Sequence, residues 1–248
     1  MAQSTTDGIN DFIQQLHNEF SLKDMGDLRY FLGIEVTRSS TRSLHLCQRK
    51  YIRDLLDRSS LANAKSVHTL MVSSSTLSKD EGDRLDDPTE YRSLDGALQY
   101  VVLTRPDIAY AVNRACQFMH APTTVHLVAL KRILQYLHGT INHGLIFRSS
   151  DRLSLVGYAD ANWGLDFDDR RPTTGYYPPT VWCDNFSAVA VAANPVADGS
   201  LVVGEVLAYD QVADILTKPL SVSTFARFCS LLQVLPLVKL GEAGLEYC

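Results

Sequence analysis

The sequence predicts an α/β fold, because apolar residues recur at helical spacing over most of the chain before residue 144 and alternate with a period of two after it. Pro106 and Pro122 stand where helices begin, and Gly139 stands where a helix ends. We therefore expect an N-terminal hairpin with helices, a helical middle and an incomplete C-terminal sheet.

The N-terminal residues predict one helix and then a hairpin. Residues 9–20 carry apolar side chains at helical spacing, and Asp7 is suited to cap this helix. After a turn around Gly26, residues 28–36 alternate as a single strand. The polar stretch SSTRS can close a hairpin from this strand onto Leu44–Cys47.

Four helices and a linker are expected next. The first helix covers residues 48–57, and the serine-rich, then acidic, stretch 73–87 is the candidate linker. The other three helices start near Pro88, at Pro106 and after Pro122. Each has an apolar stripe that can face a shared core.

The C-terminal third predicts strands. GLIF (144–147) and LSLVGYAD (153–160) should form a pair, with an aspartate at the end of the second strand. Residues 180–185 and 200–209 are further strand candidates, and 211–220 should form a short helix or turn.

Charge is unevenly distributed along the chain, whose net charge is −5. Seven acids lie within residues 80–95, and twelve acids face six bases within 151–248. Between these two acidic segments, residues 105–150 form a basic centre with only one acid, Asp107. Its basic residues are Arg105, Arg114, Lys131, Arg132 and Arg148. This centre permits phosphate contact by the middle segment, although an ordinary solvated helix face would have the same composition.

Several site classes receive no support. The five cysteines are scattered and form no CxxC motif, so neither a disulfide framework nor a zinc site is indicated. No apolar run reaches the roughly 18 residues of a membrane span. We expect a protein of the cytoplasm or nucleus with no membrane partner.

Eight phrases, in one consistent order, resemble the copia-type Pol polyprotein of plant retrotransposons. They are FSLKDMGDLRYFLGIEV (20–36), LCQRKYIRDLL (46–56), YRSLDGALQYVVLTRPDIAYAVNRACQFM (91–119), LKRILQYLHGT (130–140), GYADANW (157–163), DDRRPTTGY (168–176), VWCDNFSAVAVAANPV (181–196) and QVADILTKPL (211–220). The ordered set covers most of the chain and is highly specific.

The resemblance divides the chain into five parts. It implies the end of a reverse transcriptase palm with its hairpin (1–72), a linker (73–87), a helical thumb and connection (88–148), a truncated RNase H-like domain (149–220) and a tail (221–248). The polymerase aspartates of the family's Tyr-Val-Asp-Asp motif do not occur in the sequence, so polymerase activity is not expected from it.

The resemblance also implies nucleic-acid partners. Arg114, Lys131 and Arg132 are similar to thumb positions that approach a nucleic-acid backbone. The ancestral partner would be an RNA–DNA hybrid or a template-primer, and other Pol segments are possible partners.

For RNase H chemistry, the family uses four acids that hold two magnesium ions. Asp160, Asp184 and Asp214 match three of them, but the glutamate of a Ser-Thr-Glu-Ala-Glu-Tyr helix has no counterpart. Only 23 residues separate Asp160 from Asp184 (184 minus 160 minus 1), where the missing strands and helix need roughly 35. The surviving aspartates can also be read as surface carboxylates at element ends.

We therefore expect a remnant of a reverse transcriptase and RNase H that is catalytically inactive and binds no magnesium productively. Two alternatives stay open, a non-catalytic nucleic-acid-binding module and a pseudogene product without function. Because a sheet without two of its strands exposes unpaired edges, we also expect poor order beyond about residue 165.

Overall fold

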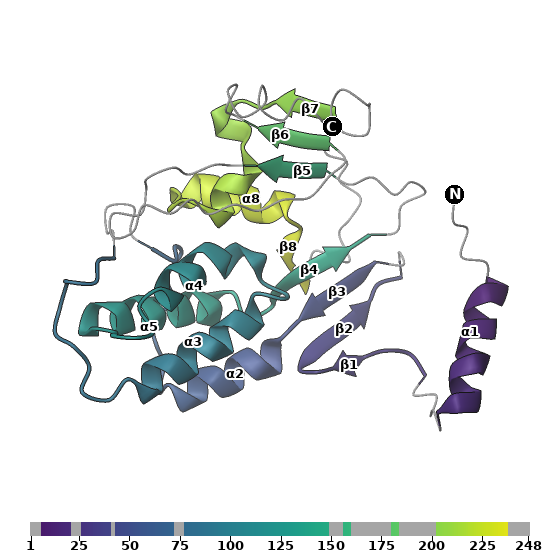
Figure 1. Ribbon diagram of the computed structural model, residues 1–248, viewed down its shortest axis with the longest axis horizontal. Helices are drawn as coiled ribbons and strands as arrows, with labels where there is room; N and C mark the ends of the chain where they lie inside the picture. The colour runs from purple at the N-terminus through teal and green to yellow at the C-terminus, as the bar shows by residue number, and fades with distance from the viewer. Residues whose placement is uncertain are drawn as a thin grey trace.

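The computed structural model describes residues 6–20, 26–40, 43–71, 77–148, 156–159, 180–183 and 202–237. Helices and two sheets make up these parts (Figure 1), consistent with the expected α/β class. The elements are α1 (Thr6–Glu19), β1 (Tyr30–Phe31), β2 (Ile34–Arg38), β3 (Leu44–Cys47), α2 (Arg49–Arg58), α3 (Thr89–Val101), η1 (Pro106–Ile108), α4 (Ala109–Cys116), α5 (Thr124–Gly139), β4 (His143–Phe147), β5 (Val156–Ala159), β6 (Thr180–Cys183), β7 (Val202–Glu205), η2 (Ala208–Asp210), η3 (Val212–Leu216), α8 (Val222–Leu231) and β8 (Val234–Pro236). Within these parts, no helix is long and apolar enough to cross a membrane.

The larger sheet has five antiparallel strands in the order β1-β2-β3-β4-β8. The single strand expected over residues 28–36 is wrong, because the backbone turns between β1 and β2. Leu32 and Gly33 both adopt left-handed conformations there, with φ of 46° and 78°. The expected pairing of this segment with β3 is confirmed for β2, where Val36 opposes Leu46. The helix expected to begin after an Asp7 cap begins at Thr6 instead.

The smaller sheet is parallel and has the order β5-β6-β7. The expected pairing of GLIF with LSLVGYAD is wrong, because β4 pairs with β3 and β8 while β5 pairs with β6. Gly144 explains why β4 suits its position: a Cβ there would lie 2.2 Å from the Leu46 carbonyl oxygen. Close backbone approach to β3 therefore requires glycine.

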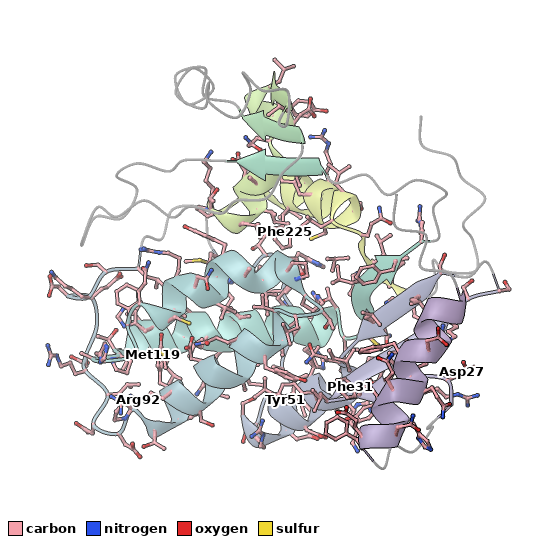
Figure 2. The ribbon with its side chains drawn as sticks, turned by 45° about the vertical axis from the view of Figure 1, so that its right-hand side comes forward. Asp27, Phe31, Tyr51, Arg92, Met119 and Phe225 are labelled. Atoms are coloured by element: carbon pink, nitrogen blue, oxygen red, sulfur yellow. The ribbon has the colours of Figure 1, made fainter. Side chains whose placement is uncertain are left out.

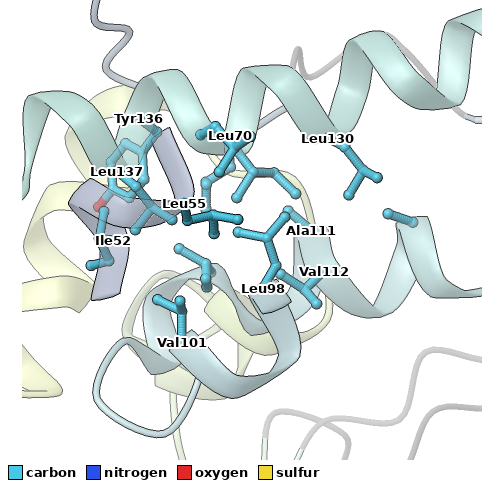
Figure 3. Packing of buried hydrophobic residues seen from close by; sticks show 14 of the residues in the cluster. Ile52, Leu55, Leu70, Leu98, Val101, Ala111, Val112, Leu130, Tyr136 and Leu137 are labelled. Atoms are coloured by element: carbon cyan, nitrogen blue, oxygen red, sulfur yellow. The ribbon is translucent and has the colours of Figure 1, made fainter. Parts of the chain in front are cut away.

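A hydrophobic core lies between the helices (Figure 3). The helical spacing predicted for residues 48–57 is confirmed in α2, which buries Ile52, Leu55 and Leu56. The turn η1 and helices α3, α4 and α5 add other buried side chains; among them are Leu98, Val101, Ile108, Val112, Leu130, Ile133, Leu134 and Leu137. Each such side chain stabilises the fold by roughly 1.5–3 kcal/mol through burial.

The C-terminal elements pack onto this core, although no helix or strand was expected beyond residue 220. Phe225 of α8 contacts Tyr136 of α5 edge to face, with ring centroids 5.6 Å apart, and Figure 2 shows it between the upper and lower parts of the molecule. Strand β8 pairs with β4. The structure describes α8 and β8 within the region where poor order was expected, and much of that region lies outside the described residues. The expectation of poor order stays a prediction.

A buried ion pair fixes the helical region. Arg105 and Asp107 are both fully buried, and the guanidinium donates to both carboxylate oxygens at 2.9 and 2.7 Å. Arg105 also donates to the Thr140 carbonyl, and the Tyr136 hydroxyl donates to Asp107. Burial lowers the pKa of Arg105, but the charge of Asp107 more than offsets this, so the net shift is upward. Arg105 therefore adds nothing to an exposed basic centre.

Candidate functional site

Two of the three predicted RNase H aspartates lie outside the described residues, but the strands before them are in place. Asp160 directly follows β5 and Asp184 directly follows β6. These strands are parallel neighbours in which Ala159 is the register partner of Cys183. Because the strands are parallel, their last residues, Ala159 and Cys183, lie at the same edge of the sheet. Strand β5 also contacts η3, which carries Asp214.

Asp214 is described and is held by an ion pair. Its helical turn, η3, packs into the core through Val212, Ala213 and Ile215. The Lys218 ammonium lies 2.7 Å from Asp214 Oδ1, and this carboxylate is only 14% exposed. Lys218, four residues along the chain, therefore holds the Asp214 carboxylate in an ion pair.

Only one carboxylate of the predicted two-metal centre, that of Asp214, lies within the described residues. Within the part of the chain that the structure covers, no group of three His, Cys, Asp or Glu residues could hold a metal ion. The Lys218 ammonium already neutralises the one described carboxylate of the predicted set. No catalytic step through magnesium is therefore derived, and the assignment of Asp160, Asp184 and Asp214 as metal ligands stays a prediction.

The three predicted nucleic-acid contacts all have partners within the chain. Arg114 donates to the Leu77 carbonyl at 3.2 Å and to Gln117 at 2.6 Å. Arg132 donates to Thr69 Oγ1 at 2.9 Å. Lys131 lies 3.8 Å from a Glu90 carboxylate oxygen, with both side chains more than one third exposed.

Their roles differ accordingly. The hydrogen bonds of Arg114 and Arg132 connect α4 and α5 to the loops that contain Leu77 and Thr69, so these two arginines stabilise the fold. Lys131 keeps a weak, solvent-screened pair and is the freest of the three to approach a phosphate. Their assignment to nucleic acid stays a prediction.

A second basic group, which sequence analysis missed, surrounds an open cavity of about 470 Å³ between the β1–β2 hairpin and α2. We name this the α2 cavity; its lining residues are Tyr30, Glu35, Arg49, Lys50, Arg53 and Asn142. Its sequence signal was the run QRKYIR, which places three cations within five residues at the start of a helix. The net charge of a long segment does not show this local concentration of basic residues.

Glu35 organises the wall of the α2 cavity. Arg49 Nε and Nη2 donate to Glu35 Oε2 at 3.0 and 2.7 Å. The backbone N–H of Lys50 donates to Glu35 Oε1 at 2.9 Å, so this carboxylate also caps the α2 N-terminus. Hydrogen bonding to Glu35 raises the pKa of Arg49. The side chains of Lys50 and Arg53 remain exposed.

The other wall is the hairpin, which is anchored at its tip. The Tyr100 hydroxyl donates to the Leu32 carbonyl. Tyr100 also meets Tyr51 edge to face, with ring centroids 5.2 Å apart. Phe31 lies on the same side of the molecule as Tyr51 in Figure 2. Tyr30 and Phe31 are 55% and 59% exposed, so their rings are open to a ligand.

The sequence profile described as "Reverse transcriptase (RNA-dependent DNA polymerase)" matches residues 1–73. The chain is 40% identical to the retrovirus-related Pol polyprotein from transposon RE1 of Arabidopsis thaliana over 294 aligned positions. This alignment covers 90% of the chain and 20% of that polyprotein. The Pol polyprotein from transposon TNT 1-94 of Nicotiana tabacum is 40% identical over 65% of the chain and 13% of its own length.

A shorter relative is matched over more of its length. The uncharacterized mitochondrial protein AtMg00810 of Arabidopsis thaliana is 40% identical over 68% of this chain and 69% of its own. No solved structure matches. The chain spans only about one fifth of the RE1 polyprotein. It belongs to the family of copia-type retrotransposon Pol polyproteins and carries part of their reverse transcriptase region.

Proposed function

We propose that this chain is a remnant of a reverse transcriptase and RNase H polyprotein that contacts nucleic acid and does not cleave RNA–DNA hybrids. The observation that carries this proposal is the direct parallel pairing of β5 with β6 across a connection of only 20 residues (180 minus 159 minus 1). Asp160 and Asp184 begin where these strands end, which is where the resembling family keeps two of its metal-binding acids.

The connection is too short for the missing part of the site. Two strands and a helix, with turns, need roughly 35 residues. The alignment with the RE1 polyprotein supports an internal deletion, because its 294 positions include only about 223 residues of this chain (90% of 248), which leaves about 71 positions (294 minus 223) without a residue of this chain. Without the glutamate-bearing helix, a pair of metal ions lacks one ligand and the groups that orient the others.

Nucleic-acid contact is supported by the polymerase half. Reverse transcriptases act on nucleic-acid templates and use divalent metal ions, and the matching profile covers residues 1–73. This stretch contains the hairpin and helix that form the α2 cavity. We assign the contact with template-primer or hybrid to this part of the chain and to the helical middle.

A cleavage assay tests the inactivity. The full chain is incubated with an end-labelled RNA–DNA hybrid and magnesium, beside an Asp184→Asn variant and an active RNase H. We expect intact RNA with both forms of this chain and cleaved RNA with the active enzyme. Magnesium-dependent cleavage that Asp184→Asn abolishes would overturn the proposal.

A second candidate function is a nucleic-acid-binding module retained without catalysis, favoured by the exposed cations of the α2 cavity. It requires hybrid binding that weakens as salt rises. Alanine at Arg114, Lys131 and Arg132 tests the predicted contacts; binding indifferent to all three removes those residues from the interface. A chain that binds no nucleic acid at all would favour the pseudogene alternative.

A further inference from the structure

We propose that Ser78 is a phosphorylation site for an acidophilic protein kinase, and that the Arg114 guanidinium holds the phosphate once it is attached. Ser78 lies in the segment that leads into α3, within the stretch interpreted above as a linker. The inference goes beyond the proposed function, because it concerns a covalent modification that requires neither nucleic-acid contact nor hybrid cleavage.

The residues that follow Ser78 form an acidic recognition segment. Asp80, Glu81 and Asp83 lie two, three and five residues after the serine, and all three side chains are exposed. A kinase whose substrate cleft is lined by basic residues selects such a segment by charge complementarity. Figure 1 shows the segment running along the outer side of the helices before it enters α3, where a kinase can reach it.

Position and burial separate Ser78 from the other hydroxyl side chains that the structure describes. Among the described serines and threonines, only Ser78 and Thr104 have an acid three residues later, Glu81 and Asp107 respectively. Thr104 is 1% exposed, and Asp107 is fully buried in its ion pair. Ser78 is half-buried and lies outside the helices and strands, so it is the acceptor of the two that a kinase can use.

The Ser78 hydroxyl is weakly engaged and therefore available for the transfer. Its Oγ accepts a long hydrogen bond of 3.5 Å from the Asp80 N–H. In the reaction, Oγ forms a bond to the γ-phosphorus of a nucleoside triphosphate that the kinase holds. The bond from that phosphorus to its bridging oxygen breaks, and a nucleoside diphosphate leaves with the electron pair. The hydroxyl proton passes to a carboxylate base of the kinase.

Arg114 lies beside this hydroxyl as a counter-ion for the product. Its Nη2 donates at 3.2 Å to the carbonyl of Leu77, which belongs to the peptide bond between Leu77 and Ser78. The guanidinium is half-buried, and it lies 6.0 Å from the centre of the Phe118 ring. Arginine and phosphate form charge-assisted hydrogen bonds, so a phosphate on Ser78 gains a partner without a large movement of α4.

Other groups around Ser78 act in both directions. Lys79 adds an exposed cation at the next position. His126 Nδ1 accepts a backbone N–H, so its Nε2 carries the hydrogen and donates to the Ser78 carbonyl at 3.1 Å. Asp80 and Glu81 repel a phosphate, but solvent screens these exposed charges. The half-buried Arg114 is screened less, which favours the phosphate position beside it.

A phosphate held by Arg114 would fasten the linker more firmly to the helices. Two backbone hydrogen bonds already join them: the Leu85 N–H donates to the Pro122 carbonyl at 3.0 Å, and the Thr124 N–H donates to the Asp83 carbonyl at 2.8 Å. An ion pair from the phosphate to α4 adds a connection just before these two. We therefore expect the junction to open less often after phosphorylation.

A kinase assay on the full chain tests the acceptor and its recognition. The chain is incubated with labelled ATP and a purified acidophilic kinase that requires an acid three residues after the serine, and the modified residues are mapped by mass spectrometry. Ser78→Ala removes the hydroxyl, and Ser78→Thr keeps one. Glu81→Gln removes the acid at the recognition position, while Asp86→Asn removes one exposed charge from the same segment and is its matched control.

We expect phosphate on Ser78 in the unchanged chain, a retained phosphate in Ser78→Thr and no phosphate at this position in Ser78→Ala. Glu81→Gln should lower the rate at Ser78 by roughly 10-fold, because one charge pair with the kinase is lost. Asp86→Asn should lower it by less than roughly 2-fold, since its charge lies farther from the serine.

Hydrogen exchange tests the role of Arg114. Phosphorylation should slow exchange of the Leu85 and Thr124 amides by roughly 5-fold, the factor for one strong surface ion pair. Arg114→Gln should still be phosphorylated on Ser78 but should lose this slowing. The amides of α2 provide the internal reference and should exchange equally in all forms.

Two sets of results would overturn the inference. An unmodified Ser78 beside phosphate mapped elsewhere, or equal rates for Glu81→Gln and Asp86→Asn, would remove Ser78 as the recognised site. Exchange that phosphorylation leaves unchanged, or slowing that persists in Arg114→Gln, would remove Arg114 as the group that holds the phosphate. Hybrid binding and hybrid cleavage are measured separately, so none of these results decides the proposed function.

Discussion

The basic residues of the helical middle and those of the α2 cavity have opposite relations to the rest of the molecule. Arg105 is buried against Asp107, and Arg132 donates to Thr69. Lys50 and Arg53 lie exposed beside a cavity. The difference teaches that a basic segment of sequence does not identify a binding surface. Cations that hold the fold together are already partnered, and those left in solvent are the ones available to a phosphate.

The largest effect is expected from breaking the buried ion pair between Arg105 and Asp107. Asp107→Ala leaves the Arg105 guanidinium buried without its counter-ion, so we expect a loss of about 3–5 kcal/mol in the free energy of unfolding. Urea denaturation measures it. Asp86→Ala, at an exposed carboxylate, is the matched control and should stay within about 0.5 kcal/mol. A loss below about 1 kcal/mol for Asp107→Ala would show that the ion pair is not structurally essential.

A second prediction concerns the sheet on which the α2 cavity is built. Gly144→Ala should destabilise by roughly 1–3 kcal/mol, because its Cβ would clash with the backbone oxygen of Leu46. Gly96→Ala, in the exposed face of α3 with nothing within 4 Å, should stabilise by about 0.5–1 kcal/mol. The two substitutions should move the unfolding midpoint in opposite directions. Shifts of the same sign would contradict the close approach of β3 and β4.

The third prediction sharpens the division between structural and exposed cations. Arg132→Ala removes the bond to Thr69 and should cost about 1 kcal/mol in stability. Lys50→Ala removes no side-chain hydrogen bond of the described residues and should stay within about 0.5 kcal/mol. In anisotropy titrations the order should reverse, with Lys50→Ala weakening oligonucleotide binding more. An equal loss of stability in Arg132→Ala and Lys50→Ala would contradict the division into structural and exposed cations.

The smallest effect is a pH dependence at the edge of the buried cluster. Burial first, and then the charge of Arg105, lower the pKa of His143 to about 4 from 6.5, while Asp107 acts in the opposite direction and His45 adds to the lowering. Because the folded-state pKa is the lower one, stability is fully present above pH 6.5 and is lost as pH falls toward 4. His143→Gln should flatten this decline by about 1 kcal/mol or less, since solvent screens the partly buried ring. Denaturation of both proteins at pH 7 and pH 4.5 measures the difference; parallel declines would contradict the assignment.

Much of the helical region was predictable because its information is local. The spacing of Ile52, Leu55 and Leu56 indicated both the helix and its buried face. The break between β1 and β2 had one local signal, Gly33, while the positive φ of Leu32 could not be predicted because a non-glycine residue gives no such signal. The pairing of β4 with β3 and β8 joins segments about one hundred residues apart in sequence, which no local pattern specifies.

The site divides in the same way. The order of the aspartate motifs could be read from the sequence, and in the structure the strands that precede Asp160 and Asp184 are parallel neighbours. The ion pair of Asp214 with Lys218 and the α2 cavity could not be predicted from the sequence. Both depend on contacts of Lys218 and Glu35 that form only when the elements pack together. Residue type identified the charges, and only packing separated partnered from exposed ones.

Manganese binding tests the central claim most directly. Crystals of the full chain soaked in manganese, examined by anomalous scattering, should show no pair of ions at the ends of β5 and β6, because the fourth acid and its helix are missing. Asp214 should remain paired with Lys218. Two ions about 3.5–4 Å apart, bridged by Asp160, Asp184 and Asp214, would contradict the account.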